Sequence, residues 1–148
     1  MTSDVRALYR DVIIDHSKRP RNFRPLEAGR KSEGHNPLCG DRLMVYVEVD
    51  NGVIRDVSFE GLGCAIATAS ASLMTESVKG KTVAEADALF ARVQRMVAAS
   101  PDAPVDDLGA LSALAGVRRF PVRVKCATLP WQTLRAAAAG GHEAVTTE

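Results

Sequence analysis

The sequence lacks the features that define several large classes of protein. Its 148 residues carry a formal net charge of +1, so no excess of one sign favours nucleic acid or an anionic membrane as a partner. No apolar run approaches the ~20 residues that a membrane-spanning helix needs. The first twenty residues carry charges every few positions and contain no apolar core of a signal peptide. We therefore expect a cytoplasmic protein that binds neither nucleic acid nor membrane.

Cysteines are few, and their spacing is unusual. Cys39, Cys64 and Cys126 are odd in number and form no C-x-x-C pair, which argues against a disulfide framework or a zinc finger. One interpretation is that all three are reduced thiols packed in the core as small apolar groups. The other is that the thiols carry chemistry, and the choice between the two depends on where each cysteine lies in the fold.

Composition and periodicity predict one domain over residues 1–148, ending in a flexible tail at 142–148. A first helix ends before Pro20, because apolar residues recur there at helical spacing. Two β-rich runs flank Asn51-Gly52, a pair typical of a type I′ hairpin turn. The helical periodicity rests on Val5, Leu8, Tyr9, Val12 and Ile13.

The rest of the chain reads as helices. One runs from Cys64 to Lys79 and ends at Gly80. Thr82 and Glu85 form a capping box for the next helix, and a short helix then ends at Gly116. The last helix extends from Pro121 to Gly140, where Pro130 should kink it or split it into two.

This order of elements predicts an α+β fold. A few strands sit together in the sequence with helices before and after them, and segregated elements of this kind pack as separate layers. We expect a small antiparallel sheet of about three strands, with one edge strand near residues 30–34 and with several helices packed on one of its faces.

The cysteines fall at the boundaries of these elements. Cys39 precedes the first hairpin strand and Cys64 follows the second, so antiparallel pairing should bring them to the same end of the hairpin. Cys64 also opens a helix, where free backbone N–H groups and the positive end of the helix dipole lower the pKa of a thiol. Cys126 lies near the start of the last helix.

A carboxylate completes this pattern. Asp41 lies two residues from Cys39, on the same side of an extended segment. Three sulfurs and one carboxylate oxygen suit a tetrahedral Zn²⁺ ion. The basic neighbours Arg42, Arg123 and Lys125 offer charge to offset the net −2 of such a site, although simple surface charge explains them equally well. Because a carboxylate exchanges more easily than a thiolate, we favour a working metal site over a structural one.

Three motifs make the chain similar to a known family. The segments "NPLCGDR", "GLGCAIATASASLMTESVKGK" and "VRRFPVRVKCATLPW" occur in an order that resembles the SufU-type sulfur acceptors of the SUF iron–sulfur cluster assembly system, within the IscU/NifU-like (SufE/NifU) fold. The resemblance covers the chain from the first helix to Trp131. It implies zinc bound by Cys39, Asp41, Cys64 and Cys126.

The resemblance also implies a partner and a reaction. A PLP-dependent cysteine desulfurase of the SufS type passes persulfide sulfur to Cys39, and the sulfur moves on to downstream SUF scaffold proteins. A histidine of the desulfurase is expected to replace Cys39 on zinc and free its thiolate for attack. Arg123 is expected to assist transfer or docking. Whether the chain counts as an enzyme, a zinc-dependent sulfurtransferase, or as a carrier acting with the desulfurase stays open.

Two other functions compete with this one. The first is an IscU-type scaffold that assembles a [2Fe–2S] cluster. Against it, Lys125 stands where such scaffolds carry a histidine, the Leu-Pro-Pro-Val-Lys segment is missing, and "SPDAPVDDLGALSALAG" fits an insertion typical of SufU. The second is a zinc-stabilised adaptor without sulfur chemistry, for which Cys39→Ala would harm folding but no transfer step.

Overall fold

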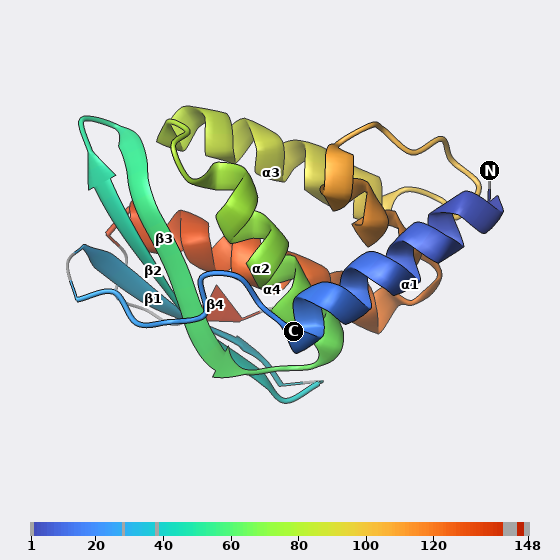
Figure 1. The fold of residues 1–148 in the computed structure, drawn as a ribbon, viewed down its shortest axis with the longest axis horizontal. Helices are drawn as coiled ribbons and strands as arrows, with labels where there is room; N and C mark the ends of the chain where they lie inside the picture. The colour runs from blue at the N-terminus through green and yellow to red at the C-terminus, as the bar shows by residue number, and fades with distance from the viewer. Residues whose placement is uncertain (1, 28, 38, 141–144, 147–148) are drawn as a thin grey trace.

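A computed structural model describes residues 2–27, 29–37, 39–140 and 145–146. The sheet lies on one side of the molecule and the helices gather on the other (Figure 1). α4 packs across β1 and β2, while α2 packs against β3. In chain order the elements are α1 (Thr2–Lys18), β1 (Arg30–Asn36), β2 (Asp41–Asp50), β3 (Val53–Leu62), α2 (Ala65–Val78), α3 (Val83–Ala98), the 3₁₀ helix η1 (Gly109–Arg119), α4 (Pro121–Ala138) and β4 (Val145–Thr146).

Three antiparallel strands form the body of the sheet, as the sequence predicts. Its strand order is β3-β2-β1-β4, with β1 and β3 both antiparallel to β2. Asn51 and Gly52 have φ of 51° and 76°, the left-handed pair that a type I′ turn requires. The α+β class with an antiparallel sheet and several helices is confirmed.

The described C-terminal residues add a fourth strand to the sheet. Val145 and Thr146 form the two-residue strand β4, which pairs in parallel with Gly34 and His35 of β1. The remaining residues of the predicted tail lie outside those that the structure describes. β1 is therefore covered over part of its free edge, next to the segment that leads to Cys39.

The core lies between the sheet and the helices. The side chains of Leu43, Val45 and Val47 alternate along β2 and are fully buried. Trp131 of α4 and Phe90 of α3 stack with their ring centres 6.0 Å apart and close the layer between these helices. Rigid packing on both sides of α4 fixes the helix that carries Cys126.

One prediction about the helices is wrong, and one of the two outcomes predicted at Pro130 does not occur. Gly116 does not end a helix, because η1 continues to Arg119; a Cβ at Gly116 would lie 2.2 Å from the Tyr9 ring, so this glycine permits close packing of α1. Pro130 does not split the last helix, since α4 runs unbroken from Pro121 to Ala138. Pro130 is buried with its neighbours on both sides, and this packing outweighs its low helix propensity.

The other helix boundaries match the prediction. α1 ends at Lys18, before Pro20, and α2 ends at Val78, before Gly80. Thr82 and Glu85 form the predicted reciprocal capping box at the start of α3. Of the described helices, none has both the length and the apolar surface that crossing a bilayer demands.

Candidate metal and thiol site

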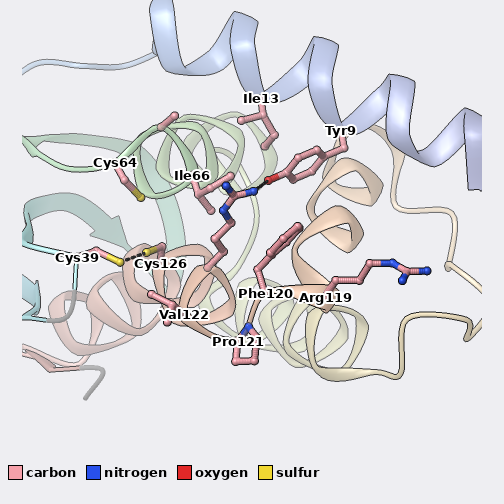
Figure 2. Close-up of a pocket in the computed structure, with 12 residues that line it drawn as sticks. Tyr9, Ile13, Cys39, Cys64, Ile66, Arg119, Phe120, Pro121, Val122 and Cys126 are labelled. Atoms are coloured by element: carbon pink, nitrogen blue, oxygen red, sulfur yellow. Dashed lines mark hydrogen bonds between the residues drawn. The ribbon is translucent and has the colours of Figure 1, made fainter.

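The fold brings three of the predicted ligands into one cluster. One ligand atom each from Cys39, Asp41 and Cys126 lies within 4.8 Å of the others. The sulfurs of Cys39 and Cys126 are 3.1 Å apart, and Figure 2 shows them pointing toward one another. Cys39 is exposed on the loop between β1 and β2, whereas Cys126 is buried in α4. The cluster thus joins an exposed cysteine on a loop to a buried cysteine in a helix.

Cys64 reaches the same carboxylate from the other hairpin strand. Its backbone N–H donates to Oδ1 of Asp41 at 2.7 Å, and its sulfur lies 3.9 Å from Oδ2. Cys64 and Cys39 also line the same cavity. Antiparallel pairing accounts for this arrangement, because Asp41 begins β2 and Cys64 follows the end of β3.

The helix start changes the chemistry of the Cys64 thiol. Cys64 caps α2, and its sulfur accepts a hydrogen bond from the N–H of Ala67 at 3.4 Å. The neighbouring Cys126 thiol and the N–H groups of Ala67 and Ile66 lower the pKa of Cys64 to about 7, although burial and the charge of Asp41 oppose the shift. The contact with Cys64, burial and the contact with Cys39 raise the pKa of Cys126. Of these two thiols, Cys64 is therefore the one that loses its proton more easily.

Sequence reasoning missed Asn36, which contacts this cluster directly. Its side chain is fully buried, and its Nδ2 donates to Oδ2 of Asp41 and to the sulfur of Cys126, each at 3.4 Å. Its backbone carbonyl accepts from the N–H of Cys39 at 3.3 Å. The available signal was its place as first residue of "NPLCGDR".

The three basic residues next to the predicted ligands lie in different places. Arg42 lies exposed beside the buried Asp41, on the opposite side of β2, and pairs with Glu33 at 2.9 Å. Of the two explanations left open for Arg42, this pairing favours simple surface charge. Lys125 is half-buried on α4. Arg123 lines the same cavity as the three thiols.

Two aromatic side chains fix the position of Arg123. Its guanidinium lies 4.4 Å from the centre of the Phe120 ring, and its Nη1 donates to the Tyr9 hydroxyl at 3.2 Å. Tyr9 belongs to α1 and Phe120 precedes α4, so this contact joins two elements at the wall of the cavity.

The thiols open into a cavity of about 650 Å³. The three cysteines lie at one end of it, and Tyr9 and Phe120 lie further along (Figure 2). Among its described lining residues there is no carboxylate, and its wall is largely apolar. The rim carries exposed apolar side chains, Phe120 at 43% and Val122 at 47%, and Leu62 at 83% precedes Cys64 by two residues.

The donor set fits a zinc ion. Thiolates and a carboxylate are ligands that Zn²⁺ takes in tetrahedral sites, at about 2.3 Å for sulfur. Two such sulfurs lie about 3.8 Å apart, so the 3.1 Å between Cys39 and Cys126 needs only a small rotation of the exposed Cys39 side chain. Cys39, Asp41 and Cys126 could hold a metal ion. Cys64 lies outside that group of three, with its sulfur 3.9 Å from Oδ2 of Asp41, and stays the predicted fourth ligand.

Comparisons with known proteins agree with this geometry. The chain is 42% identical over 127 residues to the zinc-dependent sulfurtransferase SufU of Bacillus subtilis (strain 168), covering 86% of each chain. It is 42% identical over 135 residues to the iron–sulfur cluster assembly scaffold protein IscU of Streptococcus pyogenes serotype M1, covering 91% of this chain and 85% of that one.

A solved structure extends the likeness to three dimensions. A Fervidobacterium islandicum AW-1 protein, assigned as an iron–sulfur cluster assembly scaffold for the SUF system, superposes with a TM-score of 0.79 at 36% identity, covering 88% of this chain and 96% of that one. The model of the NifU-like N terminal domain matches residues 8–127. The chain therefore belongs to the NifU-like N-terminal domain family, and it resembles SufU within that family.

Proposed function

We propose that this protein accepts persulfide sulfur from a SufS-type cysteine desulfurase on Cys39 and passes it on for iron–sulfur cluster assembly. The observation that carries the proposal is the pairing of an exposed thiol, Cys39, with the buried Asp41 and Cys126 at the end of an apolar cavity. An exposed thiol on a loop can meet a partner, while the buried members stay fixed. Membership of the family and the likeness to SufU support it.

The transfer step is a thiol–persulfide exchange. The Cys39 thiolate attacks the terminal sulfur of the desulfurase persulfide, a bond forms from Cys39 to that sulfur, and the sulfur–sulfur bond of the donor breaks. The desulfurase cysteine leaves as a thiolate, and the transferred sulfur becomes the end of a Cys39 persulfide. Oxidation state is conserved overall, so the step requires no added oxidant or reductant.

A zinc ion held by Cys39, Asp41, Cys64 and Cys126 would keep its thiol ligands deprotonated at neutral pH. The chain's own residues contribute position. Asp41 and Cys126 are buried and fixed by β2 and α4, whereas Cys39 lies on a loop. Sulfur acceptance requires Cys39 to face the donor, and the loop is the part of the site that can turn without disturbing the core.

The cavity is our candidate for the approach of the desulfurase. Its apolar rim, and the absence of carboxylates among the described residues that line it, suit an apolar segment that carries the negatively charged persulfide. Arg123 supplies the positive charge at the wall, held by Tyr9 and Phe120. We assign Arg123 to docking or to stabilising the approaching anion. Reduced thiols of this kind persist in the cytoplasm, where we place the protein and its SUF partners.

The second candidate function is a scaffold for a [2Fe–2S] cluster. The Streptococcus pyogenes relative named IscU favours it, because it is also 42% identical and covers 91% of this chain, against 86% for the Bacillus subtilis SufU. The same cysteines would then bind iron, although Lys125 stands beside the third cysteine, where such scaffolds carry a histidine.

Metal analysis of the protein as purified, combined with a desulfurase assay, separates the two. We expect about one zinc per chain and faster cysteine desulfuration when the cognate desulfurase is supplied with this protein. Iron and sulfide with a visible absorption band, and no zinc, would support the scaffold instead.

A further inference from the structure

Asn36 touches the metal site at three points. The carbonyl of Asn36 accepts from the N–H of Cys39, and its side-chain Nδ2 lies 3.4 Å from Oδ2 of Asp41 and 3.4 Å from the sulfur of Cys126. It ends β1, directly opposite Asp41 in the register of the two strands. Asn36 thus connects β1, β2 and α4.

The contacts of Asn36 divide the site into a fixed and a free part. Its side chain is fully buried, so its amide stays beside Asp41 and Cys126, which are buried as well. It contacts Cys39 through the backbone at the base of the loop, where its carbonyl accepts from the Cys39 N–H, and Cys39 is exposed. Movement of the Cys39 side chain leaves both amide contacts in place.

We propose that Asn36 is a positioning residue, whose amide holds Asp41 and Cys126 in coordinating positions while Cys39 leaves to accept sulfur. This inference rests on the proposed function. Carboxylates and thiolates at this distance repel one another, and a shared N–H donor partly offsets that repulsion and orients both groups. An amide suits this task because it carries no charge that would form an ion pair with Asp41 and compete with the metal.

The test is the zinc affinity of apo-protein titrated with Zn²⁺ against a chromophoric chelator. Asn36→Leu keeps the branched shape and removes the donor, and Asn36→Ala removes the side chain. We expect either variant to bind zinc about 10- to 100-fold more weakly, the range for lost partners of metal ligands. The matched control is Asn22→Ala, which also removes a side-chain amide. The amide of Asn22 donates to the hydroxyl of Thr75 at 3.0 Å, near the end of α2 that is far from Cys64. The zinc affinity of Asn22→Ala should equal that of the wild type.

Two further readouts separate positioning from general stability. Co²⁺ in place of zinc gives a thiolate charge-transfer band, which should shift in Asn36→Leu and stay unchanged in Asn22→Ala. In a Cys39→Ala background, the Asn36 change should weaken metal binding at least as much as in the wild type, because Asn36 acts on the ligands that remain. Equal affinity and an unchanged cobalt spectrum in Asn36→Leu would overturn the proposal.

Wild-type NMR keeps the proposal testable if the Asn36 variants do not fold. The side-chain amide signal of Asn36 should shift on zinc binding and should exchange slowly with solvent in the zinc form. An Asn36 amide signal whose chemical shift does not change on zinc binding would overturn the proposal. Failure of the proposed function is recognised separately, because the wild-type protein would then bind no zinc or would accept no sulfur.

Discussion

The backbone N–H of Cys64 donates a 2.7 Å hydrogen bond to the carboxylate of Asp41, 23 positions away in the sequence. This bond ties the start of α2 to the start of β2 and uses one oxygen of Asp41. The other oxygen lies 3.9 Å from the sulfur of Cys64 and 3.4 Å from the amide of Asn36. Asp41 therefore has two tasks, to close this end of the hairpin and to present an oxygen to the thiols.

Two substitutions of Asp41 should separate these tasks. Asp41→Asn keeps an oxygen for the Cys64 N–H, so the unfolding free energy of the apo-protein should change little, while zinc affinity falls because the anionic ligand is lost. Asp41→Ala should also lower the unfolding free energy by about 1–3 kcal/mol, because the Cys64 N–H loses its acceptor. Urea unfolding and chelator competition measure both effects. If Asp41→Ala bound zinc as tightly as the wild type, Asp41 would not be a ligand.

Val122 tests whether the rim of the cavity docks the desulfurase. Val122 lines the cavity and is 47% exposed, so Val122→Ser should leave zinc content and folding unchanged. Losing an apolar contact worth about 1 kcal/mol or more should raise the protein concentration that half-saturates the desulfurase at least fivefold. Ile14→Ser is the control, since Ile14 is 45% exposed and is not among the residues lining the cavity. Equal half-saturation for both variants and wild type would argue against docking at Val122.

Ser70 links the two helices that carry Cys64 and Cys126. Its hydroxyl donates to the carbonyl of Ala127 at 2.6 Å and accepts from Nε1 of Trp131 at 3.2 Å, all in the core. Ser70→Ala leaves the buried indole N–H of Trp131 without this acceptor and removes the hydroxyl donor to the Ala127 carbonyl, and we expect a loss of about 1–3 kcal/mol in unfolding free energy. Ser77→Ala removes a hydroxyl that bonds only within its own helix, to Leu73, and should change stability far less. Similar losses for the two serines would contradict the role given to Ser70.

His16 makes part of the stability depend on pH. Burial, followed by the nearby Arg21, lowers the pKa of His16 below its usual 6.5, although Glu76 and Asp15 act in the opposite direction. The unfolded chain therefore binds a proton before the folded protein does, and stability is lost as pH falls from about 6.5 toward the folded pKa.

The variant His16→Gln cannot gain that proton. Between pH 8 and pH 5, its unfolding free energy should fall less than that of the wild type. Denaturant unfolding of the apo-protein at a series of pH values provides the comparison. Parallel curves for the two proteins would show that His16 does not contribute. The physical basis is the burial of His16, whose Nδ1 lies 2.7 Å from the buried Ser72 hydroxyl; that hydroxyl also accepts from the N–H of Arg21.

Local signals predicted much of this fold. Asn51-Gly52 specified the hairpin turn, and Thr82 with Glu85 specified the start of α3, because each acts through its own backbone. The hairpin also predicted that Cys39 and Cys64 lie at the same end of the two strands, and both line one cavity. These features depend on short-range geometry, which the sequence expresses directly.

The features that sequence reasoning missed depend on tertiary packing. Gly116 looked like a helix stop, but its role is to admit the ring of Tyr9 from the other end of the chain. Pro130 looked like a break, but burial on both sides keeps α4 continuous. The contacts of Asn36 with Asp41 and Cys126 follow only from the packing of α4 against the sheet.

The central claim is that Cys39 accepts sulfur, and peptide mass mapping of persulfides tests it most directly. The zinc-loaded protein is incubated with its cognate desulfurase and cysteine, and free persulfides are then trapped by alkylation. We predict one added sulfur on the peptide that contains Cys39, none on the peptides that contain Cys64 or Cys126, and no labelling in Cys39→Ala. Persulfide on Cys64 or Cys126 in the wild type, or undiminished sulfur capture by Cys39→Ala, would contradict the account.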